Sequence, residues 1–169
     1  MGEQLNSFES ICKTLNDTKK LAEKFANLVS QKGAFVSLYG EIGAGKTAFV
    51  KFVADALGVQ ERVTSPSFVI LNEYHSAKIP IYHFDLYRLE NEGIKTILDE
   101  LREYSEGKML TFVEWAEFSE GNLSEERIDI IFLYDEDLSD KRIVNIYSYG
   151  AKQNIIIERL NLQIANCML

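Results

Sequence analysis

Eight consecutive residues in the first third of the chain combine three glycines with a lysine and a threonine: Gly40, Glu41, Ile42, Gly43, Ala44, Gly45, Lys46 and Thr47. This is the G-x-x-x-x-G-K-[ST] pattern of a phosphate-binding loop, or P-loop. Glycines let the backbone turn so that several N–H groups point at one anion. We expect Lys46 to reach the β- and γ-phosphates of a nucleotide, and the Thr47 hydroxyl to bind Mg²⁺.

The segments on either side of this loop are suited to hold it in place. Residues 34–39, AFVSLY, predict a short buried strand, and residues 47–57 predict a helix that Gly58 ends. The N-terminus of that helix would add its partial positive charge to the site. The local pattern therefore predicts a strand, a phosphate-binding loop and a helix in succession.

A magnesium site of this kind also needs an acidic residue at the end of a strand, and two residues compete for that role. Asp85 follows the strand-like run 81–84, and Glu114 follows the run 109–113. Spacing alone leaves the choice open; one could hold Mg²⁺ while the other orients the attacking water. His83 lies two residues before Asp85, so both share a strand face. That spacing permits a metal pair, but a hydrogen-bonded histidine is the commoner outcome.

Two further features lie near these acids in the sequence. The hydroxyl-rich segment 63–68, VTSPSF, follows the P-loop helix, and its position suits a switch that senses the γ-phosphate. The alternative is an ordinary proline turn. Trp115, the only tryptophan, follows Glu114; it would pack in the core or cover the nucleotide.

The rest of the chain alternates between strand and helix patterns. Residues 68–74 and 79–86 predict an antiparallel hairpin, and 127–134 and 142–149 predict two strands joined by the acidic turn 135–137. The other expected elements are a strand at 8–13, a helix starting at Asp17-Thr18, a helix at 91–104, a strand at 108–115 and a strand or helix at 154–162. We therefore predict one α/β domain over residues 1–169, a P-loop NTPase fold with a mixed parallel and antiparallel sheet flanked by helices.

The composition of the chain and the absence of certain motifs limit its expected location and the classes of ligand it could bind. No apolar run has the length of a membrane span, and residues 1–9 are too charged for a signal peptide. Cys12 and Cys167 are isolated, which favours reduced thiols and a cytoplasmic location. The net charge of −8 argues against a large nucleic-acid surface. There is no Asn-Lys-x-Asp motif to support GTP, and no arginine cluster after Trp115 for a kinase lid, since Arg127 and Arg142 start predicted strands.

The P-loop, the segment 64–68 (TSPSF), the segment 83–89 (HFDLYRL) and the Glu114-Trp115 pair together resemble the TsaE family. These proteins are the small bacterial ATPases of tRNA threonylcarbamoyladenosine synthesis. The order and spacing match from about Thr18 to Gly150. The P-loop is shared by many families, whereas the other segments are more diagnostic.

The resemblance implies ATP and Mg²⁺ as cofactors and assigns roles to particular residues. Lys46 and Asp85 would be catalytic, with Asp85 orienting or activating the hydrolytic water. The nucleotide would be bound by residues Gly40 to Thr47 and Ala48, with Thr18 near the adenine or ribose. Thr47 and Glu114 would hold the metal, while Thr64, Ser65, Ser67 and Trp115 would serve the switch or the partner.

The resemblance further implies partners, TsaB and TsaD, which transfer a threonylcarbamoyl group to the adenosine beside the tRNA anticodon. Four positions depart from the family pattern: Glu41, Ile42, Ala48 and Ser67. Two other functions stay open, a binding module whose partner affinity is set by nucleotide and, less favoured, a small-molecule P-loop kinase.

Overall fold

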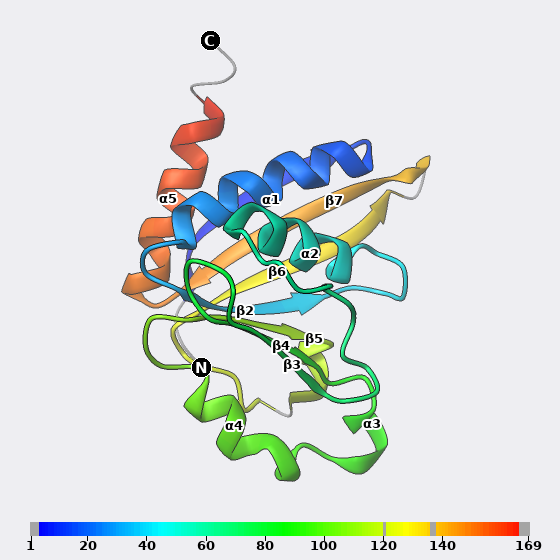
Figure 1. Ribbon diagram of the computed structural model, residues 1–169. Helices are drawn as coiled ribbons and strands as arrows, with labels where there is room; N and C mark the ends of the chain where they lie inside the picture. Colours follow the sequence, from blue (N-terminus) through cyan, green and yellow to red (C-terminus); the bar gives the residue numbers. More distant parts are fainter. Residues whose placement is uncertain (1–3, 120, 136–137, 166–169) are drawn as a thin grey trace.

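The computed structural model describes residues 4–119, 121–135 and 138–165, and it contains a seven-stranded sheet with helices on both faces (Figure 1). The strands are β1 (Gln4–Cys12), β2 (Ala34–Tyr39), β3 (Leu71–Tyr74), β4 (Ile81–Asp85), β5 (Leu110–Glu114), β6 (Arg127–Asp135) and β7 (Leu138–Tyr149). The helices are α1 (Leu15–Val29), α2 (Lys46–Leu57), α3 (Leu89–Glu92), α4 (Leu98–Glu103) and α5 (Ala151–Ala165), with short 3₁₀ turns at Lys95–Ile97 and Ala116–Ser119.

The sheet has the order β1-β7-β6-β2-β5-β4-β3. Strand β2 runs parallel to β5 and β6, and β4 runs parallel to β5, whereas β3, β7 and β1 are antiparallel to their neighbours. The predicted mixed α/β fold is therefore confirmed. The carboxyl ends of β2, β5 and β4 meet at one edge, where open α/β sheets place their ligand sites.

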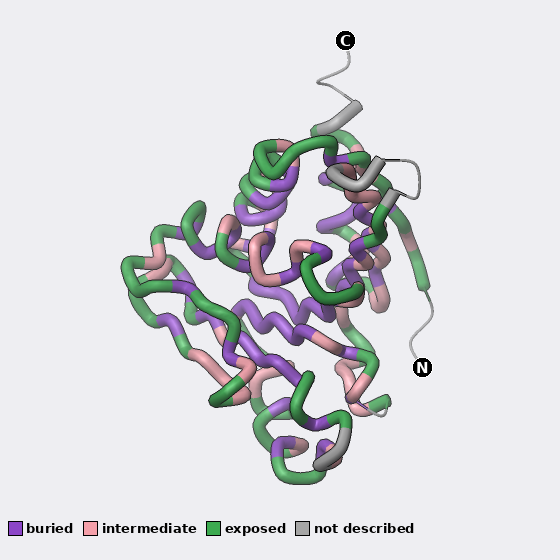
Figure 2. Tube along the Cα trace, turned by 90° about the vertical axis from the view of Figure 1, so that its right-hand side faces the viewer, coloured by how far each residue is buried: buried purple, intermediate pink, exposed green. Residues whose placement is uncertain are grey.

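Two apolar layers hold the helices on this sheet, and the buried residues in Figure 2 follow its central strands. Phe25 of α1, Val50 of α2 and Ile157 of α5 belong to one layer, which packs on one face. Leu101 of α4 and Phe84 of β4 belong to the other layer, on the opposite face. Helix α2 and the P-loop lie on the face that α1 and α5 also cover. A side chain of a strand must therefore point to that face to reach the P-loop.

The predicted strand and helix around the P-loop are confirmed by β2 and α2, and Gly58 ends α2 with a φ of +87°. The predicted start of the first helix is wrong. Helix α1 begins at Leu15 and is capped by Thr14, whose hydroxyl accepts from the backbone N–H of Asp17 at 3.2 Å. Asp17 in turn accepts from the backbone N–H of Thr14 at 3.0 Å. It thus completes a capping box inside the helix and does not begin it.

The hairpin of β3 and β4 is confirmed, but β3 is shorter than predicted. The backbone N–H groups of Val69 and Ile70 both donate to the carbonyl of Pro66, at 2.9 and 2.7 Å, and Ile70 has a φ of +70°. These bonds fold residues 66–70 into a turn before β3 begins at Leu71. The segment 63–68 therefore continues as an irregular loop up to the strand.

The continuous helix predicted over 91–104 is wrong. Gly93 has a φ of +77°, which stops α3 at Glu92; the chain then makes a 3₁₀ turn and the short helix α4. The expected strand start at Arg142 is also wrong, because β7 begins at Leu138. Of the acidic turn predicted between these strands, Glu136 and Asp137 lie outside the described residues. Residues 154–162, for which the sequence allowed either a strand or a helix, lie within helix α5.

Cys12 is a buried free thiol at the end of β1, and Cys167 lies outside the described residues. Within the described part of the chain, no helix combines the length and the apolar character needed to cross a bilayer.

Candidate functional site

The P-loop connects β2 to α2 and presents backbone N–H groups at the edge of the sheet. Gly45 caps the helix with a φ of +112°, a conformation that other residues rarely adopt. Gly40 has no room for a side chain, because a Cβ there would lie 2.6 Å from the carbonyl oxygen of Phe132. The N–H groups in the first turn of α2, from Lys46 to Ala48, have no partner within the helix. The loop therefore offers several donors to one anion.

Lys46 lies folded back over this loop. Its Nζ donates to the carbonyls of Gly40 and Glu41, the second at 3.1 Å, and lies 3.8 Å from the centroid of the Trp115 ring. Burial lowers the pKa of the Lys46 ammonium, and the negative charge of Glu114 opposes that shift. The ammonium thus has neutral partners, two carbonyls and an indole face. A phosphate would be a stronger partner, because its negative charge attracts the ammonium more strongly than neutral carbonyls do.

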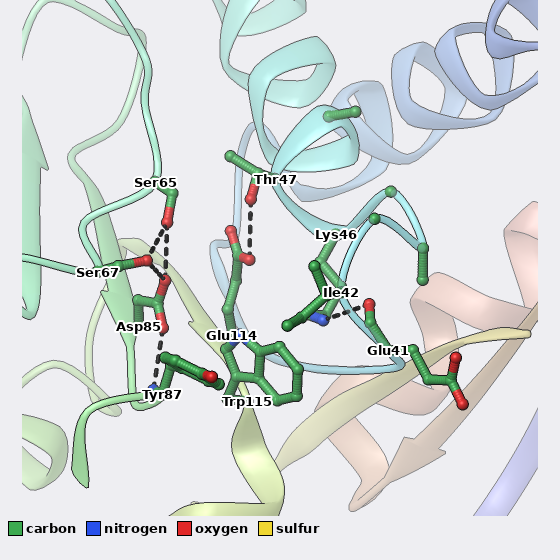
Figure 3. A pocket seen from close by; sticks show the side chains of 14 residues that line it. Glu41, Ile42, Lys46, Thr47, Ser65, Ser67, Asp85, Tyr87, Glu114 and Trp115 are labelled. Carbon is green, nitrogen blue, oxygen red and sulfur yellow. Dashed lines mark hydrogen bonds between the residues drawn. The ribbon is translucent and has the colours of Figure 1, made fainter. Parts of the chain in front are cut away.

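Thr47 and Glu114 are joined directly, as the close view of the pocket shows (Figure 3). The Thr47 hydroxyl donates to Oε2 of Glu114 at 2.9 Å, and the other carboxylate oxygen, Oε1, lies 2.8 Å from Nε2 of His83. Glu114 is only 2% exposed and His83 is fully buried. The structure therefore places Glu114, and not Asp85, beside the hydroxyl of the P-loop. It also gives His83 a hydrogen-bonded role, the commoner of the two outcomes considered from its spacing.

Asp85 lies on the same side of the sheet but contacts the loop that precedes β3. Its carboxylate accepts from the hydroxyls of Ser65, at 2.7 Å, and Ser67, and from the backbone N–H of Tyr87 at 3.0 Å (Figure 3). Asp85 itself is 1% exposed. The two serines of the predicted switch thus converge on one buried carboxylate.

These groups line a pocket of about 490 Å³. It contains every predicted site residue except Gly40, Thr18 and Thr64: Glu41, Ile42, Gly43, Ala44, Gly45, Lys46, Thr47, Ala48, Ser65, Ser67, Asp85, Glu114 and Trp115. Tyr87 also lines it, with its ring centroid 5.0 Å from that of Trp115. Sequence reasoning missed Tyr87, although it lies only two residues after Asp85.

Trp115 is half-buried and lies between the apolar core and the pocket. One side of its environment is structural, since it stacks on Phe118 with ring centroids 5.9 Å apart. It also lines the pocket and faces the Lys46 ammonium. Its φ of +57° is unusual for a tryptophan, and such backbone strain is found preferentially at functional sites.

Thr18 lies on the far side of the P-loop, in a second hollow of about 180 Å³ that it shares with Gly43, Ala44, Gly45 and Arg142. The structure thus places Thr18 beside the P-loop but outside the pocket that contains Lys46 and Thr47, and a contact of Thr18 with adenine or ribose stays a prediction. Arg142 was missed as a site residue because its strand was predicted to begin there. Thr64 lines neither hollow; its carbonyl accepts from the Asn72 side chain at 3.1 Å.

The donors in the pocket suit magnesium held together with a nucleotide. Among the described residues, no group of three or more His, Cys, Asp or Glu side chains could hold a metal ion unaided. Thr47 and Glu114 offer a hydroxyl and a carboxylate oxygen. Mg²⁺ is usually bound by one or two such protein oxygens, with phosphates and waters completing its shell. The residues present therefore fit a Mg²⁺–nucleotide complex better than a metal bound by protein alone.

Comparisons with known proteins converge on one family. Residues 12–144 match the sequence model of the family described as threonylcarbamoyl adenosine biosynthesis protein TsaE. The chain is 36% identical over 145 residues to the tRNA threonylcarbamoyladenosine biosynthesis protein TsaE of Bacillus subtilis, spanning 86% of this chain and 88% of that protein. It is 38% identical over 144 residues to the Aquifex aeolicus protein of the same description, spanning 82% and 95%.

A solved structure gives the same result for the fold. The crystal structure of Bacillus subtilis YdiB aligns with a TM-score of 0.74 and 31% sequence identity, over 96% of this chain and 97% of that chain. The similarity thus extends over nearly the whole length of both chains.

Proposed function

This chain belongs to the TsaE family of tRNA threonylcarbamoyladenosine biosynthesis proteins, and we therefore propose that it is a Mg²⁺-dependent ATPase of that pathway, acting in the cytoplasm. The observation that carries the proposal is the convergence of the P-loop, Lys46, the Thr47–Glu114 pair and Asp85 on a single pocket. Phosphoryl chemistry requires little covalent participation by the protein, so positioning and charge are what a site must supply.

Each group in the pocket has a distinct task in this proposal. The N–H groups of the P-loop bind the phosphates, and Lys46 leaves its carbonyl partners to neutralise the phosphate oxygens. Thr47 and Glu114 are the protein ligands of Mg²⁺, which when bound neutralises charge that develops on the phosphates. Asp85 orients the attacking water. Because it also holds Ser65 and Ser67, a change at the γ-phosphate would reach the switch loop through this carboxylate.

We also propose that the chain acts on the TsaB–TsaD transferase complex and reaches tRNA only through it. The net charge of −8 supports this indirect route, because an acidic protein attracts nucleic acid poorly. Two large apolar side chains support a protein partner at the switch: Phe68 is 88% exposed and Val69 is 64% exposed. They lie on the loop that Asp85 holds.

The same exposed side chains favour a second candidate function, a binding module whose partner affinity is set by the nucleotide while turnover is incidental. Comparing tRNA modification over many turnovers with ATP and with a non-hydrolysable analogue separates the two. Full modification with the analogue would favour the module, whereas a requirement for ATP would favour the hydrolase.

The ATPase proposal is tested with Asp85→Ala in the presence of the partner proteins. We expect this variant to bind ATP within about threefold of the wild type, because Asp85 contacts the switch loop and not the P-loop. Hydrolysis should fall by roughly 100-fold or more, as for loss of a general acid–base residue. Hydrolysis at the wild-type rate would show that the role given to Asp85 is wrong.

A further inference from the structure

His83 occupies the centre of β4 and is completely buried. In the parallel pairing of β4 with β5, His83 lies opposite Phe112 and Asp85 lies opposite Glu114. Side chains two residues apart on a strand point to the same face, so His83 lies on the α2 side of the sheet with Asp85. It is too deep to line the pocket, and Glu114 separates it from Thr47.

The direction of the His83 hydrogen bond follows from the chemistry of its partner. A carboxylate only accepts hydrogen bonds, and one oxygen of Glu114, Oε2, already accepts from the Thr47 hydroxyl. The other oxygen, Oε1, lies 2.8 Å from Nε2 of His83, so Nε2 carries the hydrogen and donates it. Glu114 is therefore gripped from both sides, by a histidine behind it and by the P-loop hydroxyl in front.

The second ring nitrogen of His83 shows that this histidine is not explained by packing. Nδ1 is buried and has no hydrogen-bond partner among the described residues. An apolar side chain such as methionine could fill the same part of the core without leaving a polar atom unpaired. Buried unpaired polar atoms are uncommon in folded proteins, and their presence calls for a reason other than stability.

We propose that His83 is the positioning residue of Glu114: its Nε2–H fixes the carboxylate so that Oε2 stays on the pocket side, next to Thr47. The χ3 torsion of a glutamate has a broad distribution, so the single hydrogen bond from the Thr47 hydroxyl leaves the Glu114 carboxylate free to rotate. A second donor on the opposite oxygen removes that freedom. Hydrogen-bond partners of metal-binding side chains act in this way elsewhere, and losing one typically weakens metal binding by about 10- to 100-fold.

The inference rests on the proposed role of Thr47 and Glu114 as magnesium ligands, and its test measures binding. ADP affinity is determined by calorimetry in EDTA and across a series of MgCl₂ concentrations for wild type, His83→Met and His83→Gln. In His83→Met, the Mg²⁺ concentration that gives half of the maximal increase in ADP affinity should rise by about 10- to 100-fold. The ADP affinity measured in EDTA should stay within about twofold of the wild type. In His83→Gln, whose amide N–H can replace Nε2–H, most of the Mg²⁺ dependence should return.

A matched control removes packing as an explanation. Phe84→Leu alters the next buried residue of β4, on the opposite face of the sheet, and should leave the Mg²⁺ dependence unchanged. An equal loss of ADP affinity in EDTA and in Mg²⁺ for His83→Met, or no recovery in His83→Gln, would overturn the inference.

A measurement on the wild-type chain without nucleotide keeps the inference testable even if the variants do not fold. Nitrogen-15 NMR of the histidine side chains should find a hydrogen on Nε2 of His83; a bare Nε2 would overturn the inference. The two proposals fail in different ways. If the ADP affinity of the wild type is the same in EDTA and in MgCl₂, both the proposed metal site and the inference are wrong. If wild-type ADP binding depends on Mg²⁺ and His83→Met shows the same dependence, the metal site stands and only the role given to His83 is wrong.

Discussion

The loop that contains Ser65 and Ser67 should open more easily once both hydroxyls are removed. In the closed loop both side chains donate to the Asp85 carboxylate, and the backbone N–H groups of Val69 and Ile70 donate to the carbonyl of Pro66. A double Ser→Ala variant keeps the backbone turn but removes the only side-chain donors that Asp85 has among the described residues. The protection of the Val69 and Ile70 amides then measures how firmly the carboxylate holds the loop.

The expected change in the free energy of loop opening follows from the number of these hydrogen bonds and from the exposure of the two serines. A hydrogen bond to a charged group contributes about 1.5–3 kcal/mol when it is well protected. Ser65 is exposed and Ser67 is half-buried, so we take about 1–1.5 kcal/mol for each bond, or about 2–3 kcal/mol together. Since 1.4 kcal/mol corresponds to a factor of ten, opening should become roughly 30- to 150-fold more favourable.

Native-state hydrogen exchange followed by NMR provides the assay, because it reports the free energy of local opening for each amide. Exchange at Val69 and Ile70 should accelerate by that factor in the double variant, while the amides of β2 and β5 keep their protection. Ser105→Ala is the matched control. Its hydroxyl donates to the carbonyl of Arg102, at the end of α4, and has no part in the loop. Exchange at Val69 and Ile70 within threefold of the wild type in the double variant would refute the reasoning that Asp85 holds the loop.

Three further outcomes are expected. Lys46→Met should weaken ADP binding by roughly 100-fold or more through the loss of charged contacts with phosphate, whereas Lys51→Met, on an exposed position of the same helix, should change it less than about twofold; calorimetry measures both. Trp115 is the only tryptophan and faces the Lys46 ammonium, so nucleotide should shift its fluorescence in the wild type but not in Lys46→Met. Burial raises the pKa of Tyr39 from 10.0 to about 12, so the folded chain keeps a proton that the unfolded chain loses. Stability to urea should therefore fall as the pH rises from 10 to 12, and less so in Tyr39→Phe.

The parts of the fold that the sequence predicts well are those with local causes. The P-loop, β2 and α2 follow from glycines, a lysine and one buried run in direct succession. The β3–β4 hairpin follows from two strand-like runs and a short turn. The errors also have local causes that compete with periodicity. Gly93 interrupts an apolar pattern that otherwise suits a helix, and the bonds to the carbonyl of Pro66 take residues 66–70 out of β3.

The pairing of side chains in the site could not be predicted in the same way. Glu114 meets Thr47, 67 residues away, and His83, 31 residues away. Those contacts depend on the order and register of parallel strands, which spacing along the chain does not specify. The same holds for Arg142, which the chain brings to the P-loop from β7.

The order of the strands explains why two similar acidic residues have different partners. Asp85 and Glu114 end adjacent parallel strands in register, so they lie side by side at one edge of the sheet. Strand β5 pairs with β2, which leads into the P-loop, while β4 is one strand further away, a distance of about 4.8 Å. Glu114 is therefore within reach of Thr47, and Asp85 is left facing the loop that leads into β3. Because β5 lies between β4 and β2, the two carboxylates cannot exchange roles unless the strand order changes. Replacing either one should disturb a different half of the site.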